Sequence, residues 1–171
     1  MSIEETLGTV ALFEGLTDDE IRRIASIGRV EYFNQDATLF AEGELGPRLL
    51  VVLEGRVDVL RSDAAGVRRS VGSVGPGEAL GEISLLLELP RSATVRALDD
   101  LKCFTMDRTS FTDLVDAGDP AALKLGMALA RGLATRLLKL NDRMLGLLAE
   151  SDAGTNLHDV LDTSPGLFRL I

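Results

Sequence analysis

The sequence predicts a mainly β fold with flanking helices: a double-stranded β-helix, or jelly-roll barrel, with N-terminal helices and a long C-terminal helix. Two observations support this prediction. Between Val30 and Thr109, short apolar segments alternate with glycine turns at a spacing that gives about seven or eight strands. On both sides of this region, apolar residues recur at helical spacing instead. A chain of 171 residues can hold one globular domain and a helical appendage.

Residues 3 to about 29 are predicted to be helical. Thr17 and Glu20 have the spacing of a capping box, in which each side chain accepts a hydrogen bond from the backbone of the other residue. Ile21 and Ile24 follow at helical spacing. Phe13, just before this pattern, is expected to help pack the helix onto the barrel.

The strand region is marked by glycine turns. Gly55 separates an apolar run from a segment in which valines alternate with polar residues, and Gly66 lies in a predicted hairpin loop. The turn that begins at Gly75 ends the return strand, and residues 80–90 interrupt the strand pattern. The clearest predicted strands are 49–53, 57–59, 67–74, 94–97 and 102–106.

A long helix is predicted from Asp119 to Glu150. Asp119 is a suitable N-cap, and Pro120 takes the first helical position, where its missing N–H costs nothing. Apolar or small residues then alternate at spacings of four and three, a coiled-coil seam with Asn141 as its one polar position. The seam consists of Leu123, Met127, Ala130, Ala134, Leu137, Asn141, Met144 and Leu148.

These patterns predict three parts. Residues 1–118 form the barrel with its N-terminal helices, residues 119–150 form a helix that makes a homodimer, and residues 151–171 form a flexible tail. A small barrel alone cannot cover the seam of so long a helix.

Composition excludes several kinds of function. The formal net charge of −9, without a stripe of Lys and Arg, argues against direct binding of nucleic acid. His158 is the only histidine and Cys103 the only cysteine, which argues against an enzyme, a metal site or a disulfide. No apolar run is long enough to cross a membrane and the first residues do not form a signal peptide, so we expect a cytoplasmic protein.

The interruption at residues 80–90 carries the chemistry. Gly81 precedes a predicted helical turn, where backbone N–H groups can approach an anion. Arg91 can add a charge-assisted grip on phosphate oxygens, and Glu82 can accept hydrogen bonds from hydroxyl groups such as those of a ribose. Without further sequence context, Glu82 and Arg91 could equally form a surface ion pair that has no function.

The segment from Leu80 to Ala97 resembles the phosphate-binding cassette of the cyclic-nucleotide-binding domain family. That family includes the regulatory subunits of cAMP-dependent kinase and the bacterial catabolite activator protein. Further motifs of this family are matched at residues 12–16, 40–44, 53–59 and 74–78, so the resemblance covers residues from about 10 to 150.

The resemblance implies a ligand and a site. Glu82 corresponds to the ligand of the ribose 2′-hydroxyl and Arg91 to the phosphate ligand. The implied ligand is cAMP, with cGMP as the alternative, and no cofactor is implied. The resemblance also makes the helix at residues 119–150 both the dimer helix and the lid of the pocket. The other implied binding residues are Gly81, Ile83 and Ser84 through backbone groups, Ser92 and Ala93 beside the phosphate and base, Val59, Val71 and Gly72 on the apolar side of the base, and Leu140 and Asn141 facing the base from the long helix.

Ser92 and Asn141 each have two interpretations. The Ser92 hydroxyl can bind the guanine amino group or a phosphate oxygen, and cAMP is favoured over cGMP. The Asn141 amide can reach the purine edge or pair with its mate across a parallel dimer, and the dimer role is favoured.

Three classes of function remain. The first is a cyclic-nucleotide sensor that signals to an unidentified effector protein through the long helix. The second is a transcription factor, which needs a helix-turn-helix that the 21 residues after Glu150 do not provide. The third is a dimerisation scaffold without a ligand.

Overall fold

The computed structural model describes residues 2–87 and 89–150. The predicted tail at 151–171 lies outside them. The chain divides into two compact units, Met1–Ala130 and Arg131–Ile171. The predicted division at residues 118 and 150 remains a prediction.

The N-terminal region holds three short helices, α1 (Ile3–Gly8), η1 (Ala11–Phe13) and α2 (Asp18–Ser26). The predicted capping box starts α2: the Glu20 backbone N–H donates to the Thr17 hydroxyl, and the Thr17 N–H donates to the Glu20 carboxylate. A second capping box, between Ser2 and Glu5, starts α1. The helical segment ends earlier than predicted, because Gly28 and Arg29 already pair with strand β8 (Leu101–Asp107).

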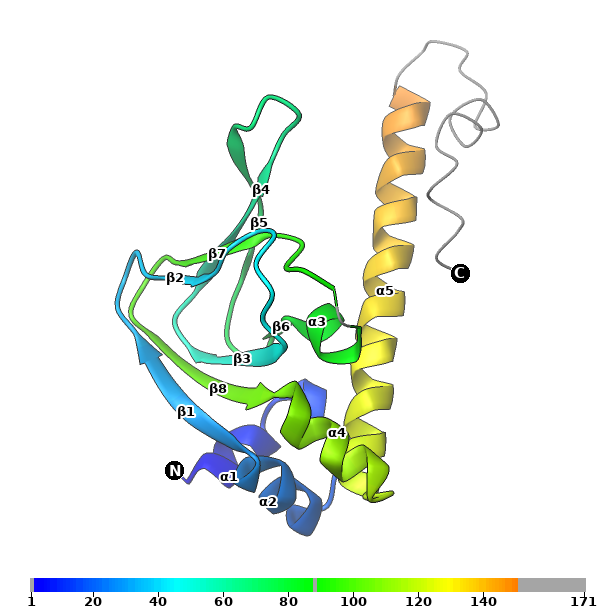
Figure 1. Cartoon of the computed structure of the whole chain (residues 1–171). Helices are drawn as coiled ribbons and strands as arrows, with labels where there is room; N and C mark the ends of the chain where they lie inside the picture. The colour runs from blue at the N-terminus through cyan, green and yellow to red at the C-terminus, as the bar shows by residue number, and fades with distance from the viewer. Residues whose placement is uncertain (1, 88, 151–171) are drawn as a thin grey trace. The chain divides into compact units, whose positions relative to one another are not determined.

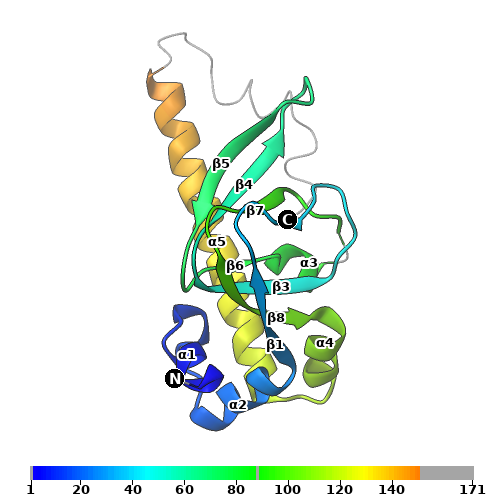
Figure 2. The same cartoon turned by 90° about the vertical axis from the view of Figure 1, so that its left-hand side faces the viewer.

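In residues 2–87 and 89–150, eight strands form two four-stranded sheets (Figure 2). One sheet has the order β1-β8-β3-β6 and the other β2-β7-β4-β5, and all pairs are antiparallel. The predicted mainly β jelly-roll with flanking helices is therefore confirmed, as two facing sheets rather than one closed barrel. The strands are β1 (Gly28–Phe33), β2 (Thr38–Phe40), β3 (Arg48–Glu54), β4 (Val57–Ser62), β5 (Arg68–Val74), β6 (Ala79–Leu80), β7 (Thr94–Ala97) and β8 (Leu101–Asp107).

Strand β3 lies between two hydrophobic clusters. Its alternate residues Leu50 and Val52 join a cluster with residues of the second sheet, such as Val57 and Val95. Leu49, Val51 and Leu53 point to the opposite face and join a cluster that the helices cover. This explains why residues 49–53 form an unbroken apolar run.

Three further helices follow: α3 (Glu82–Leu86), α4 (Arg108–Asp116) and α5 (Pro120–Glu150). The sequence patterns did not predict α4, which lies at the same end of the sheets as α1 and α2 (Figure 1). The predicted N-cap of the long helix is confirmed, since the Ala121 backbone N–H donates to Asp119 Oδ1 at 2.9 Å. Among the described residues, no helix combines the length and the apolar character needed to cross a membrane.

The first turns of α5 have two different apolar faces. Ala121, Leu125 and Leu129 are buried in the cluster under the first sheet. Leu123 and Met127, the first two positions of the predicted seam, are 52% and 57% exposed. The seam is therefore distinct from the stripe that holds the helix to its own domain.

Candidate functional site

The central part of the cassette, residues 81–93, connects β6 of the first sheet to β7 of the second sheet. Gly81 directly precedes α3 and has a φ of +80°, in the left-handed region that favours glycine. A Cβ atom at this position would lie 2.4 Å from the Arg48 carbonyl oxygen and 2.4 Å from Arg91 Nη1. Both the backbone conformation and the close packing therefore require glycine here.

The first turn of α3 buries polar side chains. Glu82 is 6% exposed and Ser84 is 4% exposed, while Ile83 between them is half-buried. Glutamate is almost never buried without a partner. Burial lowers the pKa of the Arg91 guanidinium, and the negative charge of Glu82 offsets part of this lowering. The structure thus brings together the two residues that the sequence selected as ribose and phosphate ligands.

Arg91 is a buried cation with unused donors. Its side chain is 5% exposed, and Nη2 donates a hydrogen bond to the Arg48 carbonyl oxygen at 3.0 Å. Nε and Nη1 are buried without a hydrogen-bond acceptor among the residues that the structure describes. Burial lowers the pKa of Arg91 to about 10, which leaves the guanidinium charged at neutral pH.

Sequence reasoning missed the groups that surround Arg91. Of the neighbouring charges, Glu44 raises the pKa of Arg91 most. The Arg91 N–H donates to the Glu44 carbonyl, and the Gly43 N–H donates to the Arg91 carbonyl, both at 2.9 Å. The Phe40 ring lies against the guanidinium. Residues 40–44 matched a family motif, which was the available signal, but a motif does not say which distant residue it will contact.

The remaining predicted residues of the first unit lie on β4 and β5 and in the bend before β7. Val59 on β4 is half-buried and is paired with Gly72 on β5. The register shifts beside this pair, so that Val71 faces no partner residue of its own, and it is 57% exposed. Ser92 is exposed and Ala93 half-buried, directly after Arg91. Their contacts with a base or phosphate remain predictions.

Leu140 and Asn141 belong to the second unit, Arg131–Ile171. Leu140 is 50% exposed and Asn141 is also exposed. Their predicted position facing the base remains a prediction.

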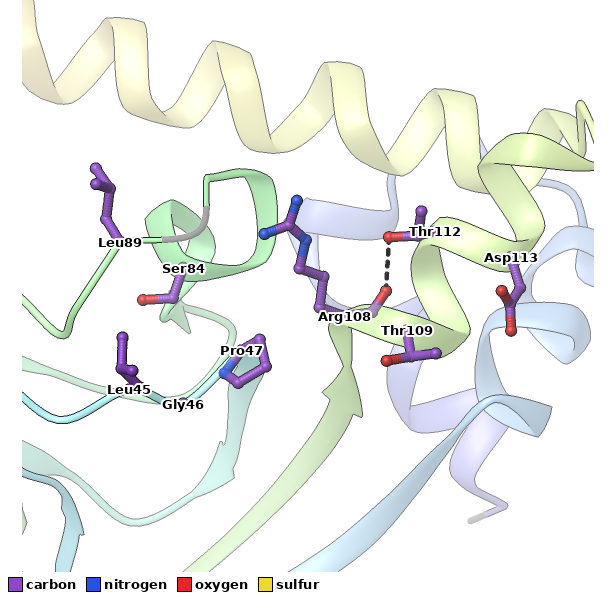
Figure 3. A pocket seen from close by; sticks show the side chains of 9 residues that line it. All are labelled: Leu45, Gly46, Pro47, Ser84, Leu89, Arg108, Thr109, Thr112 and Asp113. Carbon is purple, nitrogen blue, oxygen red and sulfur yellow. Dashed lines mark hydrogen bonds between the residues drawn. The ribbon is translucent and has the colours of Figure 1, made fainter.

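A cavity of about 590 Å³ lies beside α3 (Figure 3). Its lining comes from the loop 45–47, from Ser84 and Leu89, and from the first turns of α4 at Arg108, Thr109, Thr112 and Asp113. Of the residues selected from the sequence, only Ser84 lines this cavity. The candidate site is therefore defined by Glu82 and Arg91 and not by this cavity.

Comparison with known proteins identifies the family. The family model described as "Cyclic nucleotide-binding domain" matches residues 30–117, which include the whole cassette. The chain belongs to this family. The expected resemblance is thus confirmed, and the Glu82–Arg91 pair lies in a cyclic nucleotide-binding domain.

One curated relative and two solved structures illustrate the similarity. The "Cyclic AMP receptor protein" of Thermus thermophilus is 33% identical over 130 residues, which cover 76% of this chain and 60% of the relative. A cyclic nucleotide-binding domain from Methylobacillus flagellatus has a TM-score of 0.75 and 26% identity, covering 84% of this chain and 81% of the neighbour. The regulatory domain of Toxoplasma gondii PKA, co-crystallised with cAMP, has a TM-score of 0.59 and 28% identity, covering 65% of this chain and 42% of that one. The chain spans about 60% of the length of its curated Thermus relative.

Proposed function

We propose that this domain is a non-catalytic, cytoplasmic sensor that binds a cyclic nucleotide, with cAMP preferred over cGMP, and signals to a partner protein through α5. The observation that carries this proposal is the buried, charged side chain of Arg91, with Nε and Nη1 left without an acceptor among the described residues. A buried cation is costly unless it is paired and hydrogen-bonded. A phosphate diester with one negative charge and two exocyclic oxygens supplies both the charge and the acceptors.

Glu82 is the proposed ligand of the ribose. Its carboxylate can accept a hydrogen bond from the 2′-hydroxyl, which a cyclic 3′,5′-phosphate leaves unmodified. The nearby backbone groups of Gly81, Ile83 and Ser84 would complete the contacts with the sugar and phosphate. Val59, Val71 and Gly72 would line the apolar side of the base.

The choice of cAMP rests on chemistry and on relatives. Ser92 is exposed beside Arg91, where its hydroxyl can serve a phosphate oxygen or the guanine amino group. The Thermus thermophilus relative is named for cyclic AMP, and the Toxoplasma gondii domain was crystallised with cAMP. We therefore assign the Ser92 hydroxyl to the phosphate and favour adenine over guanine.

A shared hydrophobic cluster supports signalling through α5. Leu85, on the cassette helix α3, is 1% exposed and belongs to the same cluster as Leu125 and Leu129 at the start of α5. A shift of α3 on ligand binding would change the packing around these leucines, because close-packed cores transmit displacement. The ligand can move the equilibrium only by its differential affinity for the two states, ~1–3 kcal/mol in typical cases.

We also propose that the domain forms a homodimer through α5. The exposed seam positions Leu123 and Met127 are spaced as in a coiled coil, and Leu137 and Met144 continue the spacing. If no nucleotide binds, this seam supports the alternative function, a dimerisation scaffold that keeps the fold.

A thermal-shift series tests the proposed function. The purified protein is titrated with cAMP, cGMP, cyclic di-GMP and, as a control, the acyclic 5′-AMP. We expect the largest rise in Tm with cAMP, a smaller rise with cGMP and none with 5′-AMP, since a ligand that binds only the folded state stabilises it by mass action. No response to any nucleotide would contradict the sensor and favour the scaffold.

A further inference from the structure

The aromatic ring of Phe40 lies against the guanidinium of Arg91. The guanidinium carbon is 3.6 Å from the ring centroid, and both side chains are at least 95% buried. A cation over an aromatic face is attracted by the ring's negative face, and the attraction is larger when both groups are removed from water. Phe40 therefore contributes more to this site than apolar volume in the core.

The backbone fixes Arg91 as well as the ring does. The Arg91 backbone N–H donates to the Glu44 carbonyl, and the Arg91 carbonyl accepts from the Gly43 N–H. In the side chain, Nη2 donates to the Arg48 carbonyl. The ring and this carbonyl thus hold one face and one edge of the guanidinium. Because neither group is an anion, neither neutralises the charge.

Two glycines shape the space around the same guanidinium. A Cβ at Gly81 would lie 2.4 Å from Nη1, and a Cβ at Gly46 would lie 3.4 Å from Nε and Nη2. Any larger residue at Gly81 would push the guanidinium from its place on the ring. The position of Arg91 is therefore determined by Phe40, Gly46, Arg48 and Gly81, which come from three separate segments of the chain.

We propose that Phe40 is a positioning residue that holds Arg91 in the orientation that binds the phosphate. This inference rests on the proposed function. The ring stabilises the charge without consuming an N–H donor, whereas a carboxylate in its place would pair with the guanidinium and occupy the donors that a phosphate needs. An arginine that is already ordered loses less conformational freedom when the ligand binds.

The test uses three variants of the full chain. Phe40→Leu removes the aromatic face, and Phe40→Tyr keeps it. Phe13→Leu is the matched control, because Phe13 is equally buried but packs edge-on against Phe104 in the other cluster. For each variant, the Kd for cAMP is measured by calorimetry, and the Arg91 Nε–H signal of the ligand-free protein is recorded by NMR, assigned by its absence in Arg91→Ala.

We expect Phe40→Leu to raise the Kd for cAMP by about three- to thirtyfold, the range of a cation–π contact from partial to full burial. The same variant should move the Nε–H signal, whereas Phe40→Tyr and Phe13→Leu should leave both readouts near those of the parent. A Kd for Phe40→Leu within twofold of that for Phe13→Leu would overturn the positioning role.

The two proposals fail in different ways. If Arg91→Ala weakens cAMP binding and Phe40→Leu does not, the sensor stands and the role of Phe40 is wrong. If the parent protein does not bind cAMP or cGMP, the proposed function is wrong, and the positioning role, which needs a bound phosphate, fails with it.

Discussion

The side chain of Arg91 is hydrogen-bonded to the backbone carbonyl of Arg48, 43 positions earlier in the chain, at 3.0 Å from Nη2. This bond ties the cassette to the first residue of strand β3. It fixes the direction of the guanidinium without cancelling its charge, because a carbonyl is neutral. Burial lowers the pKa of Arg91 to about 10, so the group stays a cation at neutral pH. An anionic ligand would supply the acceptors that Nε and Nη1 lack among the described residues.

The role of Glu82 is tested by removing either partner of the proposed hydrogen bond. Glu82→Ala should weaken cAMP binding by about tenfold or more, because a hydrogen bond to a charged group contributes roughly 1.5–3 kcal/mol. The same substitution should change the affinity for 2′-deoxy-cAMP far less, since that ligand lacks the hydroxyl. Calorimetry with both ligands measures the difference, and Glu14→Ala, at an exposed glutamate, is the control. An equal loss of affinity for the two ligands would show that Glu82 does not bind the ribose 2′-hydroxyl.

Gly81→Ala should destabilise the domain and abolish nucleotide binding. A residue with a side chain loses ~1–3 kcal/mol of stability in the left-handed backbone conformation of this position. The added methyl group would also collide with the Arg48 carbonyl and the Arg91 guanidinium. Gly15→Ala is the matched control, because Gly15 has a φ of +84° and no atom within 4 Å of its added Cβ. Chemical denaturation should show a loss at Gly81 that exceeds the loss at Gly15 by ~1–3 kcal/mol. Similar losses at the two glycines would mean that the close packing at Gly81 has no energetic effect.

The start of α5 should make stability depend on pH. The Arg23 guanidinium and the Ala121 N–H donate hydrogen bonds to Asp119 and hold its pKa below the ordinary value of 3.8. A carboxyl whose pKa is lower in the folded protein stabilises the fold above its unfolded pKa, and this stabilisation is lost as the pH falls through the folded pKa. Asp119→Asn keeps the cap but not the ion pair. Its free energy of unfolding should lie below that of the parent at pH 7, and the gap should close below about pH 4. A gap that does not change with pH would contradict this role of the ion pair.

The seam on α5 predicts the oligomeric state. Leu137 is a seam position and is 55% exposed, whereas its neighbour Leu138 is off the seam and 64% exposed. Leu137→Glu should convert a dimer to a monomer, because a charge in the seam of a coiled coil would be buried without a partner. Leu138→Glu should remain dimeric. Sedimentation velocity separates these outcomes, and two variants that behave alike would argue against this seam.

Local patterns in the sequence predicted several elements correctly. The capping box joins Thr17 to Glu20, and the N-cap of α5 joins Asp119 to Ala121. In each case the two partners lie within four positions of each other, so a short stretch of sequence contains the whole interaction. Helix α4 lacks such a signal: its N-cap, Asp107, makes no side-chain capping hydrogen bond. The first two residues of β1, Gly28 and Arg29, are predicted to be helical. The local sequence does not show their strand pairing, because the partner of Gly28, Met106, is 78 positions away.

The same limit applies to the candidate site. Glu82 and Arg91 were found from the sequence because they belong to one short segment with a recognisable pattern. Phe40 lies 51 positions before Arg91, and its apolar character alone predicts only a core residue. Its contact with the guanidinium depends on how β2 and β7 pair within the second sheet, which the spacing along the chain does not determine.

The most direct test of the sensor is the affinity of Arg91→Ala for cAMP, measured by calorimetry beside the parent and Arg96→Ala. Arg96 is an exposed arginine on β7 and controls for the loss of a positive charge. We predict that Arg91→Ala loses about 2 kcal/mol or more, roughly thirtyfold in Kd, with the fold intact, and that Arg96→Ala binds as the parent does. An Arg91→Ala variant that binds cAMP as tightly as the parent would contradict the assignment of this residue to the phosphate.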